Sequence, residues 1–266
     1  MRLKIQHETR YRFDAPVSYG LQQLRKTPKT SHQQWVLAWE TQVTGGIKEL
    51  SFDDYHHNVT ELISFERGVT ELVVTSRGEV ELNDTHGVVG RHRGPAPLWL
   101  YQRETDRTKA RTGVRGLVRQ VEGDGDLEQM HSLLAVIRDA VAYEVGVSHP
   151  DWTAEDAIEE GRGVCQDHTH IFIACAREMG LPARYVSGYL MLEDRVAQDA
   201  MHAWAEVHIE ALGWVGFDVS NGISPDTRYV RVATGLDYSD AAPVSGTRIG
   251  GNAESLDVRI EVQAQQ

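Results

Sequence analysis

The chain begins with an alternation of apolar and polar side chains that restricts its first part to β structure. Between residues 3 and 13, one set of side chains alternates with lysine, arginine, glutamine and glutamate: Leu3, Ile5, His7, Thr9, Tyr11 and Phe13. A period of two places such a set on one face of a strand. Further strands are predicted at 35–43, 61–65, 69–75 and 79–82, with Ser76-Arg77-Gly78 as a hairpin turn. Short strands at close spacing predict a β-sandwich.

The remainder of the chain mixes helices and strands. A stretch rich in Gly, His and Arg, from Asp84 to Pro97, interrupts the strand pattern and predicts a linker. We therefore divide the chain into a β-sandwich domain at 1–95 and a second domain at 96–266. Helices are predicted at 113–121, 126–143, 153–160 and 164–179. Strands follow at 183–192, 202–209 and 214–219, with two late strands near 247–249 and 256–262. This order predicts an α+β fold for the second domain.

Charge and hydropathy exclude several classes of partner. The sequence has 27 Lys and Arg against 39 Asp and Glu, a net charge of −12. An acidic surface repels phosphate backbones, so we expect no nucleic acid. The longest apolar runs are far shorter than the ~20 residues of a membrane helix, and the first residues contain no apolar signal segment. We expect no membrane association and a cytoplasmic location.

Cys165 stands where a cysteine is chemically activated. The segment Gly161-Arg162-Gly163-Val164-Cys165 leads two glycines directly into a predicted helix. A helix N-terminus carries about half a positive charge and unpaired N–H groups, which favour a thiolate and can bind an oxyanion. We expect Gly163 to keep the approach of a substrate carbonyl open. Cys175, in the middle of the same helix, is expected to be buried, and at ~15 Å from Cys165 both thiols are expected to be free.

A base and a carboxylate follow at matching positions. On the predicted strand 202–209, alternation places His202 and Trp204 on one face. The next strand ends at Asp218. A connecting loop of five residues centred on Ala211 would put Asp218 across from Trp204 and diagonal to His202, within reach of a hydrogen bond. His202 would then be the base for Cys165, and Asp218 would orient the imidazole.

Four segments together resemble the bacterial transglutaminase-like superfamily: Gly161 to Asp167, Gly180 to Tyr189, His202-Ala203-Trp204, and Gly213 to Asp218. The resemblance implies a papain-like α+β core behind an N-terminal β domain, and Cys-His-Asp chemistry on a peptide or carboxamide carbonyl through a thioester. Three positions depart from the family pattern. His168 stands where an aromatic residue is common, Val219-Ser220 replaces Pro-Thr, and Leu236 replaces an arginine.

Within this interpretation, we expect hydrolysis of a peptide or amide bond in a peptide or protein substrate, without a cofactor. Protein-glutamine transamidation and a non-catalytic binding module are the alternatives. Further candidates for the substrate or oxyanion site are Gln166, Trp152, Tyr143 and Trp204, although core packing is the favoured interpretation of the tryptophans. The N-terminal domain could gate the cleft, bind a partner or form a homo-oligomer.

A metal site is a separate hypothesis, because several ligand-type side chains are present: Cys165, His168, His170, His202, His208, His56 and His57. On a helix, however, residues 165 and 168 share a face while residue 170 points ~140° away from 168. No paired Cys-x2-Cys or His-x3-His motif completes the set. We therefore expect no metal.

Overall fold

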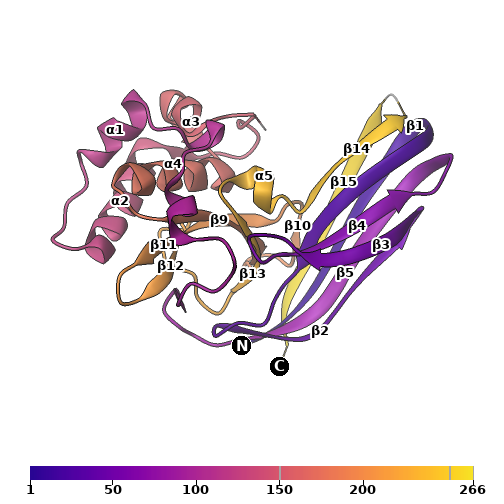
Figure 1. Cartoon of the computed structure of the whole chain (residues 1–266), viewed down its shortest axis with the longest axis horizontal. Coiled ribbons are helices and arrows are strands. Elements are labelled where there is room, and N and C mark those ends of the chain that lie inside the picture. Colours follow the sequence, from indigo (N-terminus) through magenta and orange to yellow (C-terminus); the bar gives the residue numbers. More distant parts are fainter. Residues whose placement is uncertain (150, 252, 266) are drawn as a thin grey trace.

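The computed structural model describes residues 1–149, 151–251 and 253–265. Two lobes lie side by side: a wing of long strands, and a lobe in which helices cover a second sheet (Figure 1). The fold is thus α+β, as the sequence predicts, with a β region in front of the helical core. No helix within the described ranges is long and apolar enough to cross a membrane.

The wing is one antiparallel sheet built around a single long, bent strand. Its eight strands are β1 (Arg2–Thr27), β2 (Gln34–Thr44), β3 (Gly46–Asp53), β4 (Val59–Phe65), β5 (Val69–Leu82), β10 (Ala197–Gln198), β14 (Val244–Gly250) and β15 (Glu254–Gln265). The first half of β1 pairs with β5 and β15, and its second half pairs with β4 and β14. The sheet therefore curls over a core of its own, formed by Tyr11, Phe13, Val17, Leu24, Ile63, Leu72 and Val74.

The hairpin turn predicted at Ser76-Arg77-Gly78 is wrong, because β5 runs unbroken through it. Gly78 lies opposite Trp39 on the neighbouring strand β2. A Cβ atom at this position would collide with the Ala38 carbonyl oxygen and the Trp39 ring. The glycine permits a close approach of two strands rather than a turn.

The second sheet has five strands in the order β13-β9-β11-β12-β6. Their bounds are β6 (Val88–Gly90), β9 (Ala183–Leu190), β11 (His202–Ile209), β12 (Gly213–Phe217) and β13 (Tyr229–Gly235). The main helix, α4 (Cys165–Glu178), packs against β11, and its middle from Ile171 to Ala176 is fully buried. The other elements are η1 (Leu98–Gln102), η2 (Asp106–Thr108), α1 (Thr112–Val118), α2 (Asp126–Ala140), β7 (Ala142–Tyr143), α3 (Ala154–Glu160), β8 (Arg162–Gly163) and α5 (Tyr238–Ala241).

Strand pairing crosses residue 95 in both directions. The two late strands predicted from sequence form as β14 and β15, but they return to the wing and pair with β1. Conversely, β6 precedes residue 95 and pairs with β12 of the second sheet. β14 and β15 thus cover one edge of β1, and β6 covers the outer edge of β12. A division of the chain into 1–95 and 96–266 stays a prediction.

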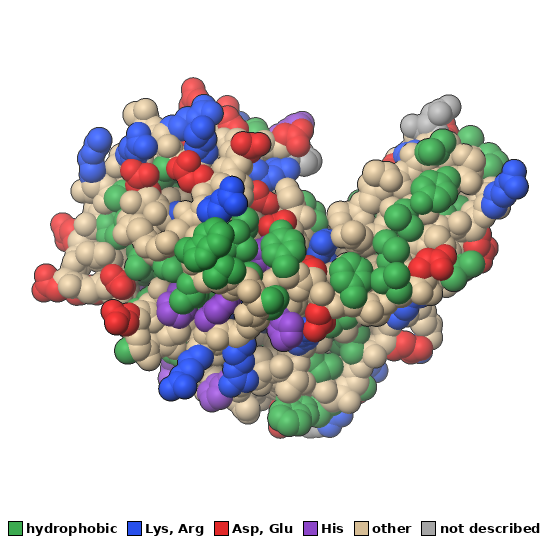
Figure 2. Space-filling view, in the orientation of Figure 1, with side chains coloured by type: hydrophobic (Ala, Val, Ile, Leu, Met, Phe, Trp, Pro, Cys, Tyr) green, Lys and Arg blue, Asp and Glu red, His purple; other side chains and the backbone are tan. Residues whose placement is uncertain are grey.

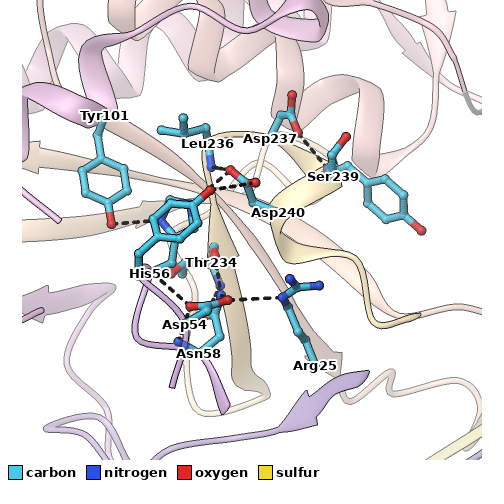
Figure 3. A network of polar contacts seen from close by, with 12 residues as sticks. Arg25, Asp54, His56, Asn58, Tyr101, Thr234, Leu236, Asp237, Ser239 and Asp240 are labelled. Atoms are coloured by element: carbon cyan, nitrogen blue, oxygen red, sulfur yellow. Dashed lines mark hydrogen bonds and ion pairs between the residues drawn. The ribbon is translucent and has the colours of Figure 1, made fainter. Parts of the chain in front are cut away.

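A polar network fastens the turn between β3 and β4 to the helical lobe (Figure 3). Asp54 accepts hydrogen bonds from Arg25 Nε at 3.2 Å and from Asn58 Nδ2 at 3.0 Å. The amide of Asn58 also bonds both backbone groups of Thr234 on β13, at 2.7 and 2.8 Å. His56 contacts Asp240 of α5 at 3.1 Å. The wing and the lobe are thereby held in one relative position beside α5.

Candidate active site

Cys165 is the first residue of α4, and the chain before it is shaped by local pairing. Gly161 ends α3 with a left-handed φ of 66°. Residues Arg162 and Gly163 then pair with Ala142 and Tyr143 as a two-stranded parallel ribbon. Val164 caps the helix, and its N–H donates to Asp167 Oδ2 at 2.8 Å. The first N–H groups of the helix have no acceptor within it, so they are available to an oxyanion beside the partly exposed thiol.

Gly163 is required by this capping carboxylate. A Cβ atom at position 163 would lie 2.8 Å from Asp167 Cβ and Oδ2. Asp167 itself is buried, with 1% exposure. The packing shows that this glycine makes room for the Asp167 side chain that caps the helix. An open approach for a substrate carbonyl stays a prediction.

The strands β11 and β12 pair in the register that the sequence predicts. Ala205 lies opposite Phe217 and Ile209 opposite Gly213, so Ala211 is at the centre of the turn and Asp218 continues the strand across from Trp204. The turn has a left-handed residue at Ala211, with φ of 69°. Three residues connect the paired positions instead of five, which leaves the parity unchanged.

His202 joins Asp218 and Cys165. Its Nε2 lies 2.6 Å from Asp218 Oδ2, and Cys165 lies close enough to raise the pKa of the imidazole. Because Nε2 is engaged with the carboxylate, Nδ1 is the ring nitrogen left to interact with the thiol. The imidazole is 12% exposed and the carboxylate 1% exposed. The carboxylate and the imidazole are thus joined at the end of the sheet, next to the partly exposed thiol at the head of α4.

The charges of His202 and Asp218 stabilise each other. Burial alone lowers the pKa of His202, but its interactions with Cys165 and Asp218 prevail and raise it to about 10. Burial alone raises the pKa of Asp218, but the hydrogen bonds from His202, Asn221 and Tyr229 lower it on balance. At neutral pH the imidazole is therefore protonated and the carboxylate ionised.

Two further residues hold Asp218, and sequence reasoning missed both. Asn221 donates its Nδ2 to Asp218 Oδ2 at 2.7 Å. Tyr229, the first residue of β13, donates its hydroxyl to the same oxygen at 2.8 Å. Burial and the carboxylate raise the pKa of Tyr229, so its hydroxyl remains a donor. Asn221 follows Asp218 by three residues in a turn, a weak signal in sequence, and Tyr229 offered none.

The other predicted site residues are placed as follows. Tyr143 is 53% exposed and lies close to Cys165, whose charge contributes to raising the tyrosine pKa after the larger effect of burial. Gln166 is half-buried in the first turn of α4. Trp152 is half-buried and packs against the main core. Trp204 is 1% exposed and stacks on the His202 ring at 6.3 Å between centroids, so it supports the imidazole from within the core.

Two of the departures from the family pattern contact each other. His168 Nδ1 lies 3.0 Å from Ser220 Oγ, and His168 Nε2 lies 3.0 Å from the carbonyl oxygen of Val141. A carbonyl only accepts, so Nε2 carries the proton; burial lowers the pKa of His168, and Nδ1 of the neutral ring accepts from Ser220. The contact ties α4 to the turn that begins at Asp218.

The histidines of the metal hypothesis are spread over separate environments. His56 lies between Tyr101 and Asp240, while fully buried His170 accepts the N–H of Tyr238 at 3.2 Å. Burial lowers the pKa of His170 to about 3, so it is a neutral core residue. Within the described part of the chain, no group of three or more His, Cys, Asp or Glu side chains could hold a metal ion.

Comparisons with known proteins identify the family to which two regions of the chain are similar. The model of the transglutaminase-like superfamily matches residues 115–219, and the model of the bacterial transglutaminase-like N-terminal region matches residues 3–81. The crystal structure of a candidate cysteine protease from Cytophaga hutchinsonii has the same fold, with a TM-score of 0.79 over 99% of this chain and 90% of that one at 22% identity.

Two mycobacterial relatives are also similar in sequence. An uncharacterized protein of Mycobacterium leprae is 27% identical over 277 residues, which cover 98% of each chain. An uncharacterized protein of Mycobacterium tuberculosis is 35% identical over 148 residues, which cover 51% of this chain and 47% of the relative. The chain belongs to the transglutaminase-like superfamily, and the bacterial N-terminal region of that family precedes its core.

Proposed function

We propose that this protein is a cysteine hydrolase that cleaves peptide or carboxamide bonds, with Cys165 as nucleophile, His202 as base and acid, and Asp218 as the group that orients the imidazole. The observation that carries the proposal is the position of His202, which bonds Asp218 through Nε2 and whose pKa is raised by the nearby Cys165. A nucleophile, a base and an orienting carboxylate in this order are the requirements of acyl transfer through a covalent intermediate.

The chemistry follows from the geometry. The Cys165 sulfur, as a thiolate beside the His202 imidazolium, attacks the carbonyl carbon, and the oxyanion is received by the N–H groups at the head of α4. Collapse breaks the C–N bond, and the leaving amine takes the proton from His202 Nδ1. Water then attacks the thioester and gives a proton to His202, which releases the carboxylic acid and restores the pair.

Solvent access favours hydrolysis over cross-linking. Transamidation requires that water be kept from the thioester while an amine enters. Here the Cys165 thiol is partly exposed and Tyr143 beside it is half-exposed. This partial exposure gives water a route to the thioester. Protein-glutamine transamidation is the second candidate, since it uses the same three side chains.

The test is to incubate the protein with a peptide library and an amine donor, and to identify products by mass. Cleavage and deamidation each have a mass signature different from that of amine incorporation. We expect cleavage or deamidation with the wild type and neither with Cys165→Ala. A Cys175→Ala variant is the matched control, because that thiol is buried and burial raises its pKa. Absence of all three products from the wild type would leave the binding-module alternative.

A further inference from the structure

The last strand of the wing, β15, has an outer edge that is paired with another strand over only two residues. On one side β15 pairs with β1 from residue 254 to 265 in an unbroken register. On the other side it pairs with β10 alone, Ala197 with Glu261 and Gln198 with Ile260. Among the described residues, nothing pairs with the outer edge of β15 from Glu254 to Arg259.

The backbone groups at this open edge can be assigned. The N–H of Val262 donates outward to the Val196 carbonyl at 3.3 Å, and the Ala253 carbonyl faces inward to the N–H of Asp14. Because N–H and C=O groups of alternate residues point to alternate sides, the even-numbered residues of β15 face outward. Leu256 and Val258 therefore present unpaired donors and acceptors, and Leu256 is 55% exposed. Such an edge pairs readily with an added extended strand.

The edge lies beside the catalytic centre. The segment that forms β10 occupies this edge and then turns into β11, where His202 follows Gln198 by four residues. Four residues span at most about 14 Å, so the Cα atom of His202 lies within that distance of the Cα atom of Gln198, which pairs with this edge. In Figure 1, β14 and β15 form the side of the wing that faces α5. Figure 2 shows an open notch in the surface between the two lobes on that side.

We propose that the open edge of β15 binds an extended peptide segment of the substrate by strand addition, in line with β10, and so holds it beside Cys165 and His202. This inference rests on the proposed hydrolase function and names its substrate as a peptide in extended conformation. The wing then serves as a substrate-binding element.

The charges along the site define the peptide further. Exposed side chains on this edge and on the segment before His202 are mostly acidic: Glu193, Asp194, Asp199, Glu254, Asp257 and Glu261, against Arg195 and Arg259. Glu193 and Glu254 are paired with Arg228 and Arg248. With these two cations included, four positive and six negative charges give 4 − 6 = −2. A peptide with basic side chains complements this surface and is attracted to it at low ionic strength.

The test compares Leu256→Pro with Leu256→Ala on two substrates. Proline removes the outward N–H of residue 256, and an edge strand tolerates proline where its N–H faces solvent. Alanine removes the same exposed side chain but keeps the N–H. The substrates are p-nitrophenyl acetate, which needs no strand pairing, and a library of twelve-residue peptides with basic and acidic subsets.

We expect Leu256→Pro to lose about fivefold in kcat/KM on the basic peptides, the value of roughly one hydrogen bond, and to hydrolyse the ester at the wild-type rate. Leu256→Ala is expected to retain peptide activity. Equal peptide activity of the proline and alanine variants overturns the strand-addition inference, as does a wild type that cleaves the ester and no peptide. A wild type that acts on neither substrate refutes the hydrolase function itself.

A second measurement applies even where the proline variant does not fold. In the Cys165→Ala protein, which binds without turnover, hydrogen exchange at the amides of Leu256 and Val258 is expected to slow when the basic peptides are added. Exchange at the inward amides of residues 255 and 257 is expected to stay unchanged. Unchanged exchange at all four amides, at peptide concentrations that saturate the wild type, contradicts the inference.

Discussion

His202 and Asp218 are joined by a hydrogen bond of 2.6 Å between Nε2 and Oδ2, across the end of two neighbouring strands. The carboxylate holds Nε2 of the ring and balances the charge of the imidazolium. We predict that Asp218→Asn lowers kcat on the order of 10³-fold or more, as in other triads of this type, with little change in KM. The control is Asp226→Asn, which removes a carboxylate paired with Arg228. Equal kcat values for the two variants would contradict a role for Asp218 in orienting His202.

The charge on His202 predicts a limit to activity and stability at high pH. The interactions that outweigh burial raise its pKa to about 10, above the unfolded value of ~6.5. The stabilisation is therefore fully present below pH ~6.5 and is lost as the pH rises through about 10. We expect kcat/KM to fall on the alkaline side near pH 10, because the leaving amine needs the imidazolium proton. The measurement is a pH profile from 6 to 11, and in Asp218→Asn the alkaline limb should move to lower pH.

The hydroxyl of Tyr229 donates to Asp218 Oδ2 at 2.8 Å, which makes Tyr229 a positioning residue. A hydrogen bond to a charged group contributes about 1.5–3 kcal/mol, so Tyr229→Phe is expected to lower kcat roughly ten- to hundredfold and to leave KM unchanged. Loss of this donor also raises the pKa of Asp218, so the acid limb of the pH profile should shift upward. Tyr55→Phe is the matched control, because Tyr55 donates to Asp240 on the surface. A Tyr229→Phe variant with the kcat and the acid limb of the wild type would show that Asn221 and His202 alone hold Asp218 in position.

The contact between His168 and Ser220 predicts an energetic coupling between the two residues. Each single substitution, His168→Phe or Ser220→Ala, removes the 3.0 Å hydrogen bond. The polar group that remains, the Ser220 hydroxyl or the His168 ring nitrogen, then lacks this hydrogen-bond partner. The double variant removes both groups. We expect its loss of stability to be smaller than the sum of the two single losses by about 0.5–1.5 kcal/mol, measured by urea denaturation. Additive losses would mean that the two side chains do not depend on each other.

The parts of the fold that follow from local chemistry are those that sequence predicts well. The register of β11 with β12 depends on spacing within a few residues, and the parity of that spacing predicts it. The helix head at Cys165 likewise follows from the two glycines before it, whereas the close contact of Gly163 with Asp167 was not predicted.

The remainder depends on contacts between distant segments. The partners of Asp218 include Tyr229 on another strand, and the last strand of the chain pairs with the first. Gly78 was interpreted as a turn because no local pattern distinguishes a turn glycine from one that admits a neighbouring strand. The return of β14 and β15 to the wing likewise has no local signal, since pairing partners are chosen by which edges remain open.

Lys26 is fully buried, and its Nζ donates a hydrogen bond to Thr9 Oγ1 at 2.5 Å. Burial lowers its pKa to about 7, and its charge contributes to lowering the pKa of nearby His7. Because the unfolded amine has a pKa of ~10.5, the unfolded chain binds more protons between pH 7 and 10.5, and stability from this group rises with pH over that range. The full cost in folding stability of burying the charged amine, about 5 kcal/mol at ~1.4 kcal/mol per pKa unit, applies below pH 7.

Lys26→Met keeps the length of the side chain and removes the charge. We therefore predict that the variant is more stable than the wild type by several kcal/mol at pH 6, and that the difference disappears toward pH 10.5. Urea denaturation of both proteins across this range measures the difference directly. Lys4→Met, on the exposed side of the same strand, is the control and should show a small difference that is constant with pH. A Lys26→Met variant that is less stable than the wild type at pH 6 would mean that the buried amine has a favourable partner that outweighs its desolvation.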